Sequence, residues 1–185
     1  MKTEIEARLL EINEKEFIEK IKAHGAIFVG DWFMNRNVYD MIPADDNKWI
    51  RLRSDGEKTT LTVKEVVNKG IEGTREHEIT VGDFDETNEI LNRLGFFARG
   101  TQTNRRIRYI LDDVEIDIDF WPMIPTYVEF ESDSAKKIEN LCNKLDIPFE
   151  SLTTMSVPEV YAYYGKNVRE FPYAYLEEER KNLKF

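Results

Sequence analysis

Polar and apolar residues alternate along much of the chain with a period of two, the repeat that places successive side chains on opposite faces of a β-strand. Turns rich in Gly, Pro, Asn and Asp separate several of these segments, as between antiparallel strands. The strands are predicted at residues 3–11, 32–41, 48–54, 58–67, 72–81, 104–111, 114–121 and 126–132.

Other segments repeat their apolar residues with helical spacing and carry capping residues at their ends. Asn13 precedes the first and Asp83 or Asp85 the second, and Gly25 and Gly95 follow them. The order of strands and helices predicts an α+β domain with one large antiparallel sheet or barrel. Helices are predicted at residues 14–24, 83–94 and 134–145, with shorter helical pieces at 157–165 and 173–183.

The length and the absence of an obvious linker or repeat predict a single domain over residues 1–185. Its core is expected over about 1–165, with a C-terminal helical extension over about 166–185. The net charge of -10 disfavours a nucleic-acid or membrane partner, because such surfaces attract basic proteins. A single cysteine, a charged N-terminus and the lack of a membrane-length apolar run favour a cytoplasmic protein.

When the charged residues are sorted by strand face, the net charge no longer argues against an anionic ligand. Glu4, Glu6 and Arg8 share one face of the first strand, and five further strands also oppose polar or ionised residues to apolar ones. If the apolar faces pack under helices, the charged faces line a common interior, which predicts a closed barrel or tunnel. The other face-sharing sets are Arg51 and Arg53; Thr60, Thr62 and Lys64; Arg106 and Arg108; Glu115, Asp117 and Asp119; and Glu129 and Glu131.

The alternative is an acidic scaffold whose charged faces point to solvent. The period of two determines which residues share a face and leaves the direction of that face open. A single charged pair is typical of a solvated sheet, whereas six such strands favour an interior. Clustered Arg and Lys bind phosphate oxygens, and clustered carboxylates without His or Cys bind Mg2+ or Mn2+. Together they indicate a metal-bound polyphosphate as the ligand.

The motifs and their order resemble the CYTH superfamily of triphosphate tunnel metalloenzymes, which includes class IV adenylate cyclases and thiamine triphosphatases. Glu4-Ile-Glu-Ala-Arg8 resembles the family's N-terminal Glu-x-Glu-x-Lys signature, and Ser156-Val-Pro-Glu-Val-Tyr161 is similar to a box of class IV cyclase-like bacterial members. The intervening matches are Tyr39-Asp40, Arg51-Leu-Arg53, Thr62-Val-Lys64, Arg106-Ile-Arg108, Asp119 and Glu129-Phe-Glu131.

This resemblance implies an eight-stranded antiparallel tunnel with helices outside, and it assigns roles to the charged residues. Lys64 and Tyr39 would activate water. The substrate would be a small triphosphate such as tripolyphosphate, ATP or thiamine triphosphate. Mg2+ or Mn2+ would be held by Glu4, Glu6, Glu129 and Glu131, assisted by Asp117 or Asp119, and the triphosphate by Arg8, Arg51, Arg53, Lys64, Arg106 and Arg108.

Three features depart from the family pattern. Arg8 stands where a lysine is usual, residues 121–125 replace a Leu-Gly turn, and Glu76 and Glu78 are out of the expected register. Hydrolysis is the leading expectation, because the sequence offers no dedicated contacts to a nucleobase. The open alternatives are cyclisation of ATP to cyclic AMP and a polyphosphate-binding module without catalysis. The chain is also compatible with a homodimer.

Overall fold

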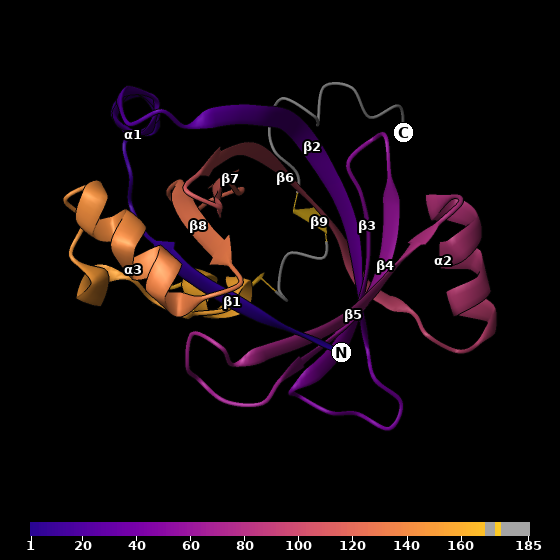
Figure 1. Ribbon diagram of the computed structural model, residues 1–185. Helices are drawn as coiled ribbons and strands as arrows, with labels where there is room; N and C mark the ends of the chain where they lie inside the picture. The colour runs from indigo at the N-terminus through magenta and orange to yellow at the C-terminus, as the bar shows by residue number, and fades with distance from the viewer. Residues whose placement is uncertain (169–172, 175–185) are drawn as a thin grey trace.

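Eight antiparallel strands close into a barrel in the computed structural model, which describes residues 1–168 and 173–174 (Figure 1). The order around the barrel is β2-β3-β4-β5-β1-β8-β7-β6, and β6 pairs back with β2. The predicted closed barrel is therefore confirmed. The strands are β1 (Lys2–Leu9), β2 (Ile27–Asp40), β3 (Lys48–Ser54), β4 (Thr59–Val66), β5 (Thr74–Val81), β6 (Ala98–Leu111), β7 (Val114–Phe120) and β8 (Tyr127–Ser132).

Helices lie outside the barrel, and their ends follow the predicted caps (Figure 1). The side chains of Asn13 and Asp83 each accept a hydrogen bond from the backbone N–H three residues later. Gly25 and Gly95 follow the first two helices with φ of 91° and 90°, a conformation that glycine adopts without strain. The helices are α1 (Glu14–Ala23), α2 (Phe84–Arg93), α3 (Ala135–Lys144) and α4 (Val157–Tyr163), with a 3-10 turn, η1 (Phe149–Ser151).

Two strands are longer than the sequence pattern predicts. β2 and β6 begin at Ile27 and Ala98 rather than at residues 32 and 104, and they pair along most of their length to close the barrel. Register shifts interrupt this pairing, and the first residues of β2 form an apolar run instead of an alternating one. The period of two is lost there, so the pattern does not reveal the full strands.

The predicted C-terminal helical piece is wrong at its first two residues. Tyr173–Ala174 form a short strand, β9, which pairs in parallel with Thr101 and Gln102 of β6. The remainder of that piece, residues 175–183, lies outside the described residues. The short helix predicted at 157–165 is present as α4.

The hydrophobic core lies between the outer faces of the strands and the surrounding helices. Ile138 and Leu141 of α3 pack with outward residues of β6, β7 and β8, including Ile107, Ile118 and Phe130. Leu91 of α2 packs in a separate cluster with outward residues of β2 and β3. This placement of the apolar faces leaves the opposite faces of the same strands to line the interior.

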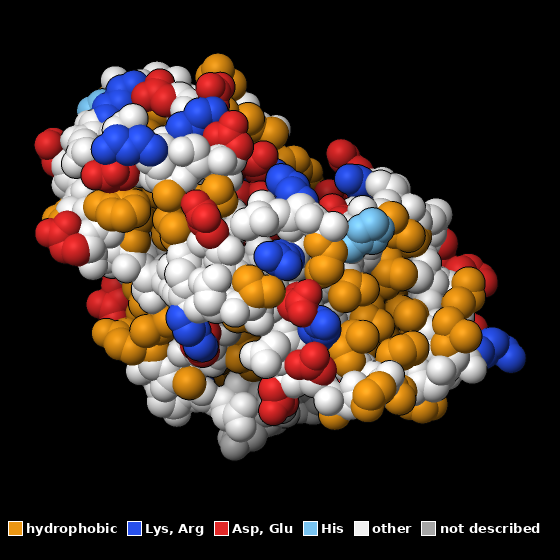
Figure 2. Space-filling model, turned by 60° about the horizontal axis from the view of Figure 1, so that its bottom comes forward, with side chains coloured by type: hydrophobic (Ala, Val, Ile, Leu, Met, Phe, Trp, Pro, Cys, Tyr) orange, Lys and Arg blue, Asp and Glu red, His pale blue; other side chains and the backbone are white. Residues whose placement is uncertain are grey.

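Part of the apolar surface remains exposed. Ile79 on β5 and Ile90 on α2 are 51% and 57% exposed. Figure 2 shows hydrophobic side chains gathered on the side of the molecule that carries these elements. Among the described residues, no helix is long and apolar enough to cross a membrane.

Candidate functional site

The inward faces of the strands line a cavity of about 570 Å³. Its walls bring together ten of the charged residues predicted for the site, so the charged faces point into the barrel rather than to solvent. Glu76 and Glu78, whose direction the sequence left open, also line it. The ten are Glu4, Glu6, Arg8, Arg51, Arg53, Lys64, Arg106, Arg108, Glu129 and Glu131.

A group of carboxylates occupies the part of the cavity formed by β1 and β8. The register places Glu6 opposite Glu131 and Arg8 opposite Glu129. Burial, together with the nearby carboxylates of Glu129 and Glu4, raises the pKa of Glu131 to about 7. This repulsion is what a bound divalent cation would relieve, and oxygen donors alone suit Mg2+ or Mn2+.

Cations of the chain engage several of these carboxylates. The Lys64 ammonium donates to both oxygens of Glu4, and Arg8 donates to Glu6 at 3.0 Å and to Glu129. No cluster of three or more His, Cys, Asp or Glu side chains arranged to hold a metal is found within residues 1–168 and 173–174. A cation bound by Glu4 and Glu6 would therefore have to replace these ion pairs.

A group of arginines on β2 and β3 carries the opposite excess of charge. The neighbouring Arg51 and burial lower the pKa of Arg53 to about 9, and burial with Arg51 lowers the pKa of Arg36 to about 10. Their acidic neighbour Glu78 lies 3.4 Å from Arg51 and 3.8 Å from Arg53. Guanidinium groups that crowd one another in a cavity are suited to bind a phosphate anion.

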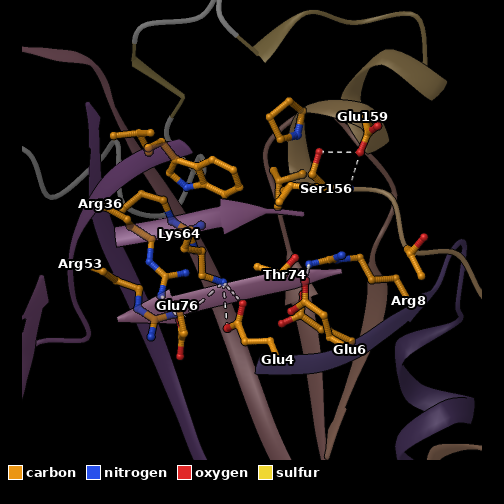
Figure 3. A pocket seen from close by; sticks show the side chains of 18 of the residues that line it. Glu4, Glu6, Arg8, Arg36, Arg53, Lys64, Thr74, Glu76, Ser156 and Glu159 are labelled. Atoms are coloured by element: carbon orange, nitrogen blue, oxygen red, sulfur yellow. Dashed lines mark hydrogen bonds and ion pairs between the residues drawn. The ribbon is translucent and has the colours of Figure 1, made fainter. Parts of the chain in front are cut away.

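Arg36 is a cavity residue that the sequence analysis missed, because no second basic residue accompanies it on its strand. Like Val38, it lies on the inward face of β2, and Figure 3 shows it beside Arg53. Its guanidinium donates to Asn104 at 2.6 Å and stacks 4.4 Å from the ring centroid of Trp121. The period-two rule applied to β2 would have indicated its direction.

Asp117 and Asp119 do not line the cavity with the four glutamates predicted to bind the metal. Both are fully buried behind the cavity surface, where Arg106 donates to each of them and also to Glu129 at 3.1 Å. Arg108 donates to Asp117 through two nitrogens at 2.6 Å. The geometry indicates that these two aspartates hold Arg106 and Arg108 in place.

Tyr39 lies outside the tunnel, so its predicted pairing with Lys64 is wrong. Its side chain packs with Ile50 and Leu91 under α2, and its hydroxyl donates to Asn88 at 2.7 Å. The alternation around Tyr39 is compatible with either face of the strand pointing inward. The pairing of β2 with β3 places Tyr39 opposite the outward-facing Ile50.

Tyr127 is a phenol that does line the cavity. It lies two residues before Glu129, on the same face of β8, and only 1% of it is exposed. Burial, with the charge of Asp119, raises its pKa well above the usual range. The alternation that predicted Glu129 and Glu131 on one face of the strand would also have placed Tyr127 on that face.

One mouth of the cavity is bordered by α4 and the loop between β4 and β5. Arg8 donates to the carbonyl of Met155 at 2.7 Å, and Lys69 of the loop pairs with Glu159 of α4. The Ser156 hydroxyl and backbone N–H both donate to Glu159, as Figure 3 shows near the wall of the pocket. The C-terminal part of the described chain thus borders the site.

Solved structures with the same fold come from several organisms. The PH1012 protein of Pyrococcus horikoshii OT3 is 24% identical over 85% of this chain and 98% of its own, with a TM-score of 0.74. A candidate adenylate cyclase of Vibrio parahaemolyticus is 16% identical over 87% and 98%, with a TM-score of 0.71. A candidate adenylyl cyclase of Hippeastrum, described as having a dominant triphosphatase activity, is 15% identical over 90% and 97%, with a TM-score of 0.59.

The family is shown by the sequence itself. No curated protein matches the chain. The family model of the CYTH domain matches residues 2–153, which include β1 to β8 and therefore the whole cavity wall formed by the barrel. On this evidence the chain belongs to the CYTH domain family.

Proposed function

We propose that the protein is a divalent-metal-dependent enzyme that binds a small triphosphate in its barrel and hydrolyses it. The observation that carries the proposal is the separation of charge within one cavity. Arg51 and Arg53 repel one another on one wall, and Glu129 and Glu131 do so on another. A triphosphate with its metal supplies the complementary charges to both walls, and such positioning and neutralisation account for most of the catalysis of phosphoryl transfer.

The metal would be Mg2+ or Mn2+, held by Glu4, Glu6, Glu129 and Glu131. These residues supply only carboxylate oxygens, and burial with the neighbouring carboxylates raises the pKa of Glu131, whose own negative charge is therefore poorly compensated. When bound, the metal would neutralise charge on the phosphates. Asp117 and Asp119 contribute indirectly, because they orient Arg106 and Arg108 toward the cavity.

Lys64 is the proposed catalytic residue in this site. Its ammonium is buried and donates to Glu4, and Glu76 lies 3.8 Å from it. In this pairing it has only donors, so it must leave Glu4 and lose a proton before it can accept one from water. Lys64 would otherwise act as a phosphate-binding cation, together with Arg8, Arg51 and Arg53.

The cavity is compatible with more than one organic group on the triphosphate. Trp49 lines the cavity on the same face of β3 as Arg51 and Arg53, and it offers an aromatic surface beside them. Trp121 also lines the cavity, but its ring already packs against Arg36 and the edge of Tyr161. Tripolyphosphate, ATP and thiamine triphosphate are therefore all to be compared as substrates.

The decisive experiment incubates the purified protein with each triphosphate and with Mg2+, Mn2+ or EDTA, and measures phosphate, pyrophosphate and cyclic AMP. Release of phosphate that depends on the metal supports the proposal. Cyclic AMP with pyrophosphate from ATP would identify the cyclase alternative. Tight binding that grows with phosphate chain length and occurs without metal or turnover would identify a binding module.

The assay needs a matched pair of variants. Arg53→Gln removes a cation from the cavity, whereas Arg93→Gln removes one from an exposed ion pair with Glu89 on α2. Only the first variant should weaken triphosphate binding. Equal effects of both would show that the cavity is not the binding site.

A homodimer remains an expectation, with the exposed apolar residues Ile79 and Ile90 as its candidate surface. Light scattering of the wild type and of Ile79→Lys would test it.

A further inference from the structure

Three buried polar atoms at one end of the cavity have no hydrogen-bond partner among the described residues. They are Nε of Arg36, Nε1 of Trp121 and the hydroxyl of Tyr127. All three side chains line the cavity, with exposed fractions of 7%, 4% and 1%. A buried donor without a partner costs free energy, and three of them in one place indicate a bound group that accepts hydrogen bonds.

The fold places these side chains near one another. Trp121 directly follows β7 and Tyr127 begins β8, so both come from the same ends of two adjacent strands. Arg36 reaches them from β2, with its guanidinium stacked on the Trp121 ring. The opposite side of this arrangement is fixed by Tyr161, whose ring meets Trp121 edge-on at 6.2 Å.

The chemistry of the three atoms selects an oxyanion. Indole and guanidinium nitrogens are donors only, and the Tyr127 hydroxyl can donate through its O–H. Arg51 and Arg106 add positive charge close to Arg36 and help to lower its pKa to about 10. Asp119, the register partner of Tyr127 across β7 and β8, already accepts hydrogen bonds from Arg106 and Asn104.

An apolar wall of packed side chains lies behind this end of the cavity, and Val168 among them also lines it. Ile124, Val160, Tyr161 and Val168 pack with Trp121 and Tyr127, and each is at most 9% exposed. A phosphoryl group at the end of a chain can use the three donors here. A phosphoryl group that carries an ester substituent would place that substituent against the buried wall.

We propose that Arg36, Trp121 and Tyr127 form a subsite for the unsubstituted terminal phosphoryl group of the substrate. This inference rests on the proposed function. It adds the orientation of the bound substrate, whose free terminal phosphate would lie beneath α4. The substrate class that follows comprises linear triphosphates with at least one free end. Triphosphates esterified at both ends are poor ligands.

Calorimetric titration in EDTA tests the subsite without requiring metal or turnover. The probes are tripolyphosphate, a nucleoside triphosphate and a dinucleoside triphosphate, whose two terminal phosphates are both esterified. Tyr127→Phe removes one hydroxyl and should weaken binding of the first two probes by roughly tenfold, the usual loss for a hydrogen bond to a charged group. It should leave binding of the third unchanged. Tyr109→Phe, on the outer face of β6, is the control.

The outcomes separate the two proposals. Equal effects of Tyr127→Phe on all three probes, or no effect on any, would overturn the subsite, while a loss of binding in Arg53→Gln would still support the proposed function. Wild-type protein that binds none of the probes, in EDTA or with Mg2+, would contradict both. Trp121→Phe should repeat the pattern of Tyr127→Phe, and a thermal melt of each variant verifies that it folds.

Discussion

The Lys64 ammonium lies 2.8 Å and 2.9 Å from the two carboxylate oxygens of Glu4, although β5 separates their strands in the barrel. Both residues are buried, with exposed fractions of 9% and 5%. The contact therefore crosses the interior and joins the cationic and acidic walls of the cavity. Under the proposed function, a substrate and its metal would have to replace this ion pair.

Lys64→Arg separates the two roles proposed for this lysine. Arginine keeps the positive charge but does not release its proton in proteins, so it can bind phosphate and cannot act as a base. We expect tripolyphosphate binding to persist and turnover to fall by roughly two orders of magnitude, the usual contribution of a general base. The measurements are calorimetry and phosphate release. Near-normal turnover, or a wild-type optimum near pH 6 instead of in the alkaline range, would exclude the base role.

Glu131→Gln should stabilise the protein in the absence of metal. The pKa of Glu131 is raised from 4.5 to about 7 by burial and neighbouring carboxylates, so the folded state binds more protons than the unfolded state between these values. Stability of the wild type therefore falls as pH rises through this window, and the variant avoids the loss. We expect a gain of about 1 to 3 kcal/mol above pH 7 and none below pH 4.5, measured by urea denaturation.

The same variant should lose its response to metal. Mg2+ or Mn2+ should raise the melting temperature of the wild type above pH 7, because a ligand that binds only the folded state stabilises it. The rise should be much smaller in Glu131→Gln. Glu139→Gln, at an exposed position on α3, is the control. An equal response in all three proteins would place the metal elsewhere.

Arg53→Gln should stabilise the protein and weaken its binding of tripolyphosphate. Arg51 and burial lower the folded-state pKa of Arg53 to about 9, below its value of 12.5 in a model peptide, so the charged side chain opposes folding at every pH below about 9. Its removal should raise the free energy of unfolding at pH 7 by about 1 to 3 kcal/mol. Tripolyphosphate affinity should fall in parallel. A variant that is both less stable and unimpaired in binding would refute the assignment.

Asp119→Asn should act mainly on stability. The Asp119 carboxylate is completely buried and accepts hydrogen bonds from Arg106 and Asn104, and breaking such a buried, charge-assisted network is strongly destabilising even though Arg106 keeps Asp117 and Glu129 as partners. The expected loss is about 3 kcal/mol in the free energy of unfolding. If Asp119 were a metal ligand, its loss would instead weaken metal binding in a protein of normal stability, which a metal titration would detect.

Tyr39→Phe should leave turnover unchanged. The hydroxyl of Tyr39 donates to Asn88 under α2 and does not reach the cavity. Loss of this buried hydrogen bond should cost about 1 kcal/mol of stability. Phosphate release by the variant should match the wild type after correction for the folded fraction. A tenfold or greater fall would mean that a phenol at this position reaches the reaction after all.

Period-two patterning predicted most of the site because most barrel strands have one buried apolar face. Glu4, Glu6 and Arg8 alternate with Ile5 and other apolar residues, and the same holds for the later strands. A register shift between Asn37 and Tyr39 alters the pairing of β2 with the start of β6, and this is where the sequence analysis misplaced Tyr39. Arg36 lies in the regular part of β2 and was overlooked because no second basic residue accompanies it on that strand. A single charged residue on a strand also gives no pair to count.

The sequence by itself determined which charges share a face and that the chain forms helices and antiparallel strands, and it predicted a metal-bound polyphosphate as the ligand. Only the tertiary structure decided which of those charges remain available. Arg106 and Asp119 are partners because β6 and β7 pair in one register, while Arg36, Arg51 and Arg53 meet because β2 and β3 pair in another. Side-chain alternation is a local property of the chain, whereas charge compensation depends on which strands pair and in which register.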